Sequence, residues 1–129
     1  MVEQNEDFAG SYNLKVHNGD LKNRPFELIH AIQFHCADGR DITVPAGYRT
    51  DFASVPRLFH RIVSPVGRHG KAAIIHDWLC DESPKTTSYK DAAAIFDEAM
   101  DALGVSWTRR KLMVMAVKLG GPKFKRGDL

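Results

Sequence analysis

Hydrophobic and polar residues alternate most regularly between residues 26 and 36, where the chain reads FELIHAIQFHC. Alternate side chains of a strand point to opposite faces, so one face of this predicted strand carries Phe26, Leu28, His30, Ile32, Phe34 and Cys36. A weaker strand is predicted over residues 12–17, ending in the Asn-Gly-Asp turn at 18–20. A turn at 37–40 leads into a strand over 41–44, and a short strand over 48–50 can follow. Residues 11–45 therefore predict a small antiparallel meander.

The hydrophobic period changes to that of helices after Pro56. Helices are predicted over residues 57–63, 71–81 and 89–103, and a fourth ends at the Gly-Gly-Pro sequence 120–122. Ser88 and Ser106 are placed to cap the last two helices, and Gly104 to end the third. Strands first and helices afterwards predict an α+β fold, a small antiparallel N-terminal sheet packed against three to four C-terminal helices.

The composition is that of a single folded domain. The chain has 129 residues, of which 43% are hydrophobic and 26% charged, far from the composition of a disordered protein. We expect one domain over 1–129, with loosely ordered tails at 1–10 and 121–129. Cys36 and Cys80 lie within apolar patterns, which favours two free thiols. The acidic N-terminus is unlike a signal peptide, and no apolar run predicts a transmembrane segment. We therefore expect the protein in the cytoplasm unless another assembly carries it out.

The net charge of +2 hides an asymmetry along the chain. Residues 105–129 carry 7 basic and 1 acidic side chains, whereas residues 1–104 carry 11 and 15. The fourth predicted helix is both basic and apolar, with Arg109 and Arg110 as candidate binding residues beside Trp107 and Met115. Its apolar side chains can pack in the core, or the helix can dock on a partner, an anionic surface or nucleic acid.

The strongest candidate chemistry lies in His76-Asp77, within AAIIHDWLC, and in the preceding loop. Neighbouring helix positions point about 100° apart, so the two side chains must serve different partners. One interpretation makes His76 a general base that Asp51 orients, with Asp77 holding a cation or completing the site. The other makes His76 a buried structural histidine, with Asp77 paired to Arg57, Arg61 or Arg68.

The loop YRTDFASVPR supplies further binding candidates in Thr50, Ser54 and Arg57. Short polar side chains also bond neighbouring backbone amides, which explains Thr50 and Ser54 without a function. Ser54 lacks the Gly-x-Ser-x-Gly context of a nucleophile. No cofactor is predicted. The alternative is a calcium or zinc ion at Asp77, although His60 and His69 lack ligand spacing and are interpreted as surface histidines.

These motifs, as an ordered set, resemble a family of small proteins encoded mainly by tailed bacteriophages and prophages and known as a domain of unknown function. The resemblance covers residues 41–119 and rests on PAGYRTDFASVPR, Pro65-Val66-Gly67, AAIIHDWLC and AIFDEAMDALGV. It implies a phage or prophage origin, and therefore the host cytoplasm, or incorporation into the virion, as the location. It also implies Asp51, Ser54, Pro56, His76 and Asp77 as signature positions. The expected function is therefore that of an accessory protein acting by binding, in a virion, a tail or their assembly, with other phage proteins or a host protein as partners.

A second, local resemblance is to the helical His-Asp pair of phospholipases A2. It implies a hydrolase in which His76 activates water and Asp77 binds calcium. Ala93 stands where both resemblances place an aspartate. We therefore hold a hydrolase, and nucleic-acid binding through the basic helix, as alternatives to an accessory binding protein.

Overall fold

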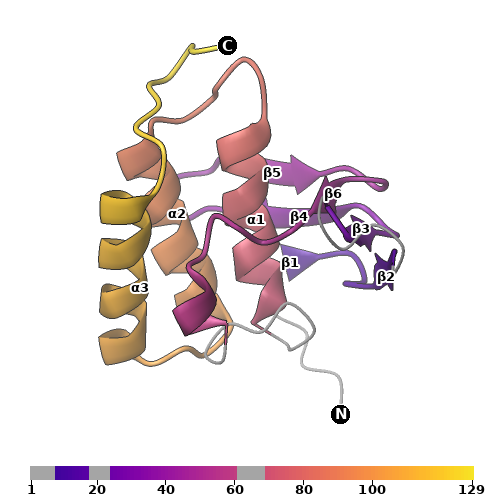
Figure 1. Cartoon of the computed structure of the whole chain (residues 1–129), viewed down its shortest axis with the longest axis horizontal. Coiled ribbons are helices and arrows are strands. Elements are labelled where there is room, and N and C mark those ends of the chain that lie inside the picture. The colour runs from indigo at the N-terminus through magenta and orange to yellow at the C-terminus, as the bar shows by residue number, and fades with distance from the viewer. Residues whose placement is uncertain (1–7, 18–23, 61–68) are drawn as a thin grey trace. The chain divides into compact units, whose positions relative to one another are not determined.

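The computed structural model describes residues 8–17, 24–60 and 69–129. The chain divides into two compact units, residues 1–51 and residues 52–129. The described strands belong to the first unit and the described helices to the second (Figure 1). The α+β class and the antiparallel N-terminal strands are confirmed. The packing of sheet on helices concerns both units together and stays a prediction.

The first unit contains a three-stranded antiparallel sheet built around the predicted hairpin. Strand β4 (Ile32–His35) pairs with β5 (Asp41–Val44) on one side and with β1 (Phe8–Ala9) on the other. The predicted turn at 37–40 is confirmed, since the Cys36 amide donates to the Arg40 carbonyl at 2.8 Å. Inward residues such as Phe34 and Val44 are fully buried, as the alternation predicts.

The strands form a second three-stranded sheet, so the prediction of a single antiparallel meander is wrong. This second sheet consists of β2 (Leu14–Val16), β3 (Phe26–Leu28) and β6 (Arg49–Thr50), in the order β2-β3-β6. The one strand predicted over 26–36 is wrong, because the chain bends at residues 29–30 and places its two halves in different sheets. Leu28 exchanges backbone hydrogen bonds with Gly47 and Tyr48, whereas Ile32 pairs with Val44. His30, which strict alternation predicts on the same face as Ile32 and Phe34, lies in this bend and is exposed.

The part of the second unit that the structure describes contains three α-helices, which confirms three of the predicted helices. They are α1 (Gly70–Asp81), α2 (Tyr89–Ala102) and α3 (Trp107–Gly120), and α2 contacts both of the others. Of the short helix predicted at 57–63, Arg57–Phe59 forms the 3₁₀ turn η2, and residues 61–63 lie outside the described residues. None of the helices that the structure describes is long and apolar enough to cross a membrane.

The ends of α2 follow the predicted capping signals. The Ser88 hydroxyl accepts a hydrogen bond from the Asp91 amide at 3.1 Å. At the other end Gly104 adopts a φ of 86°, and the Val105 amide reaches back to the Met100 carbonyl at 3.0 Å. Ser106 occupies the N-cap position of α3, but its side chain makes no capping hydrogen bond.

The segment after α3 contacts the loop between α1 and α2. The Tyr89 amide donates to the Phe124 carbonyl at 3.0 Å, and the Lys85 amide to the Asp128 carbonyl at 2.7 Å. The Phe124 ring is buried, and the Lys85 ammonium lies 4.9 Å from its centroid. Residues 124–128, which the sequence predicts to be loosely ordered, thus form backbone hydrogen bonds, and residues 1–7 lie outside the described residues.

Candidate functional site

Helix α1 places His76 in a buried, largely apolar position. The imidazole is 5% exposed, and its ring stacks at a tilt on Phe96 of α2, with 4.9 Å between the centroids. Burial lowers the pKa of His76 to about 4, because the charged imidazolium would lose its hydration. His76 is therefore neutral at physiological pH.

Cys80 follows one turn later on the same side of α1. Its sulfur lies 3.9 Å from Nε2 of His76. Burial, reinforced by the negative charges of Asp77 and Asp81 and opposed by Lys85, raises the pKa of this thiol to about 12. The side chain therefore stays a thiol and does not supply a nucleophilic thiolate. Cys36 is also a free cysteine, as predicted.

The Asp77 side chain is buried on α1, 4% exposed. Of the arginines considered as its partners, Arg57 is exposed on η2, and Arg61 and Arg68 lie outside the described residues. Among the residues that the structure describes, no group of three or more histidine, cysteine or acidic side chains is arranged to hold a metal ion.

The loop that carries the other signature positions begins at the end of the first unit. Thr50 is buried on β6, opposite Phe26, and Asp51 is exposed. Because Asp51 and His76 belong to different units, an orienting contact between them stays a prediction. The buried Ser54 hydroxyl has no hydrogen-bond partner among the described residues.

Two features of this loop were not predicted. Phe52 has a φ of 58°, in the left-handed region that bulky residues rarely adopt, while its ring is fully buried. His60, interpreted as a surface histidine, is half-buried, and its Nε2 donates to the carbonyl of Val55 at 2.8 Å and lies 3.3 Å from that of Phe52. His60 thus ties η2 to the backbone of the loop. The only feature of the sequence that could have indicated this hydrogen bond is the five-residue spacing from Val55 to His60, and such a spacing is not specific.

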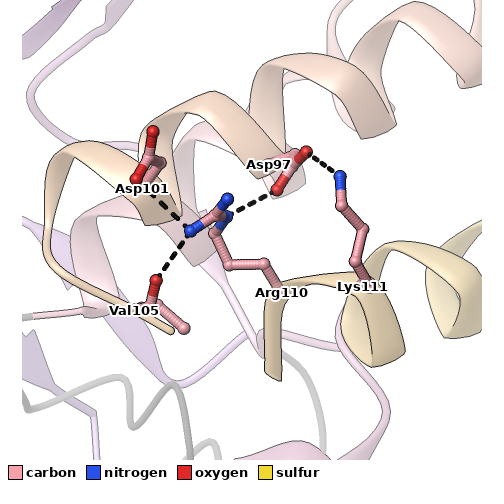
Figure 2. A network of polar contacts seen from close by, with 5 residues as sticks. All are labelled: Asp97, Asp101, Val105, Arg110 and Lys111. Atoms are coloured by element: carbon pink, nitrogen blue, oxygen red, sulfur yellow. Dashed lines mark hydrogen bonds and ion pairs between the residues drawn. The ribbon is translucent and has the colours of Figure 1, made fainter. Parts of the chain in front are cut away.

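Arg110 is part of a polar network between α2 and α3 (Figure 2). Its guanidinium bonds Asp97 at 2.8 Å, the Val105 carbonyl at 2.9 Å and Asp101 at 3.3 Å. Lys111 bonds the second oxygen of Asp97 at 2.8 Å. We call Asp97, Asp101, Arg110 and Lys111 the α2–α3 ion network. The charge of Arg110 is therefore engaged within the unit, whereas Arg109, the other predicted binding residue, is exposed.

The network also sets the ionisation of Asp97. Partial burial raises the pKa of this carboxyl, but the hydrogen bonds from Lys111 and Arg110 outweigh that effect, so the pKa is lowered overall. Asp97 is ionised at neutral pH, and the two cations hold it in place.

The opposite side of α3 carries large apolar side chains that the core does not use. Met113 and Val117 face inward and are buried. Four other side chains are exposed, and we call them the outer α3 face: Trp107 (65% exposed), Leu112 (49%), Met115 (54%) and Leu119 (76%). Core packing thus accounts for only part of the apolar pattern of this helix.

Comparison with known proteins gives the class of this chain. A family model described as Protein of unknown function (DUF1353) matches residues 26–117, and the chain belongs to this family. The matched region includes the loop, α1, α2 and most of α3.

Two relatives come from Sinorhizobium fredii. Uncharacterized protein y4jT is 36% identical over 81% of this chain, and uncharacterized protein y4iH is 36% identical over 59% of it. In each case the match spans 32% of the relative's own length. No solved structure matches the chain.

Proposed function

We propose that this chain acts by binding, as an accessory module of a larger assembly, and that the outer α3 face is its contact surface. The observation that carries the proposal is the exposure of four large apolar side chains on a helix whose other side is already packed. Covering such a face removes apolar surface from water, which lowers the free energy of a complex.

Two further observations support a binding module. The buried, neutral His76 and the protonated Cys80 thiol are typical of a packed helix interface. The matched region also makes up only 32% of two longer relatives, which favours a module that works next to other domains. From the resemblance to phage-encoded proteins, we propose a virion, a tail or an assembly intermediate as the larger assembly, and other phage proteins or a host protein as its components.

The test is the size distribution of the full chain in cells. Cell extracts are separated by density-gradient sedimentation, and the tagged protein is followed through the gradient. We expect the wild type to sediment with large particles and Leu119→Glu to stay at the top. Leu58→Glu is the matched control, because Leu58 is 81% exposed but lies on η2. A wild-type protein found only at the top of the gradient contradicts the proposal.

A hydrolase that uses His76 is the second candidate. It is favoured by one observation, that the imidazole is unprotonated at neutral pH and so is able to accept a proton. A base with a pKa of about 4 is weak, however, and the side chain is 5% exposed. If Asp77 binds Ca²⁺ or Zn²⁺, the ion must raise the melting temperature of the wild type and not that of Asp77→Asn. If our first proposal is right, neither ion changes the melting temperature of the wild type or of Asp77→Asn.

A further inference from the structure

We infer that the outer α3 face docks on an anionic lipid surface, with the helix lying along the plane of the headgroups. This inference rests on the proposed function, because it assigns a chemistry to the contact surface named there. It is carried by the shape of the face, its charge and its size.

The exposed apolar side chains form a ridge along the helix. Leu112, Met115 and Leu119 are spaced by three and four residues, so they lie on one side of α3. At ~100° per residue they centre roughly 150° around the axis from the buried Met113 and Val117. A helix whose inner side is packed and whose outer side is apolar presents a convex ridge, which suits a flat, deformable surface.

Positive charge flanks this ridge on both sides. Lys118 lies on one flank together with Trp107, and Arg109 lies on the other. Helix α3 carries no acidic residue, and residues 105–129 have 7 basic side chains against 1 acidic. Lysine and arginine stems extend along apolar surface while their charges reach headgroup phosphates, and Trp is favoured at the same depth. This arrangement is complementary to anionic lipid.

The size and the charge of the ridge argue against a second copy of this chain as its occupant. From Leu112 to Leu119 the ridge is ~10 Å long at 1.5 Å per residue and ~10 Å wide, or roughly 100 Å². A stable protein interface buries about 800 Å² on each side. Two copies paired through α3 would also oppose Arg109 and Lys118 to like charges. A small apolar ridge supported by cations is sufficient for reversible binding at a lipid interface.

The experiment measures binding of the full chain to vesicles of phosphatidylcholine, alone or with about one third phosphatidylglycerol. We expect binding to the anionic vesicles only, weakening as salt is added, with a blue shift of fluorescence that is lost in Trp107→Phe. Leu119→Glu should lower the affinity at least about tenfold, because it replaces an inserted side chain by an anion. Arg109→Gln and Lys118→Gln should each lower it by about fivefold.

Matched controls separate the outer α3 face from the rest of the surface. Leu58→Glu and Lys15→Gln make the same changes at exposed positions on η2 and β2, and both should bind vesicles as the wild type does. Absence of binding to anionic vesicles at low salt, or equal losses in the controls, overturns the inference. Tighter binding to a DNA duplex than to vesicles, unaffected by Leu119→Glu, also overturns it and assigns the cations to nucleic acid.

The vesicle assay and the gradient sedimentation distinguish failure of the lipid inference from failure of the proposed function. If vesicles do not bind but sedimentation with particles still depends on Leu119, the lipid assignment is wrong and the binding module stands. If the protein neither binds vesicles nor sediments with particles, both proposals are wrong.

Discussion

Mild acid should destabilise the second unit, because the buried His76 resists protonation in the folded chain. The pKa of His76 in the folded chain is lowered to about 4 from an ordinary value of 6.5. As the pH falls below 6.5 the unfolded chain takes up the proton first, so folding stability decreases until the pH reaches about 4. At 1.36 kcal/mol per pKa unit, the gap corresponds to a loss of about 3 kcal/mol in the free energy of unfolding.

Urea unfolding between about pH 7.5 and pH 4.5, followed by far-ultraviolet circular dichroism, measures this loss directly. In this pH range the effect of His76 can be measured without that of Asp97. The lowered pKa of Asp97 reduces the stability of the fold only when the pH falls below 3.8, the ordinary pKa of an aspartate. His76→Gln cannot titrate, so its stability should stay nearly constant across the window. His35→Gln, at a half-exposed histidine of the β4–β5 hairpin, should keep the wild-type slope. A wild-type loss below about 1 kcal/mol, or an unchanged slope in His76→Gln, refutes the reasoning.

Three further substitutions test the second unit by urea unfolding at neutral pH. Arg110→Met should cost about 2–3 kcal/mol, because a charged hydrogen bond to the half-buried Asp97 and one to a carbonyl are lost. Ser88→Ala should cost about 1 kcal/mol through loss of the cap on the Asp91 amide. Gly104→Ala should cost about 1–2 kcal/mol, because its φ of 86° disfavours a side chain.

Each of these predictions has its own check. The double variant Asp97→Asn with Arg110→Met should lose less free energy of unfolding than the sum of the two single losses. Additive losses would mean that the two side chains are not coupled. Ser106→Ala should change stability by less than about 0.5 kcal/mol, since its hydroxyl makes no capping bond, and equal losses at both serines would contradict the capping argument. Gly104→Asn should be milder than Gly104→Ala, because Asn tolerates the left-handed region.

The sequence predicts best what depends on neighbouring residues. Ser88 and Gly104 act within one turn of their own helix, so their positions suffice to predict both ends of α2. The break after Leu28 is different, because the alternation continues unchanged through residue 36. The bend depends on Leu28 bonding with Gly47 and Tyr48, which lie far along the chain.

The same distinction holds for the candidate site. His76 and Asp77 are predictable as a buried polar pair from their place in an apolar helix. The environment of His76 depends on Phe96 of another helix, and the partners of Arg110 on the packing of α2 against α3. The positive φ of Phe52 was not predicted because aromatic residues give no signal for it.

The α2–α3 ion network also supports the orientation of α3 about its own axis. Arg110 and Lys111 hold adjacent positions on the helix and both bond Asp97, so they add a polar restraint to the orientation that the buried Met113 and Val117 favour. A variant that breaks these bonds removes that restraint, and the alignment of the apolar ridge is weakened without any change in its own residues. In a screen for binding defects, Asp97 and Arg110 would then resemble contact residues although neither belongs to the contact surface.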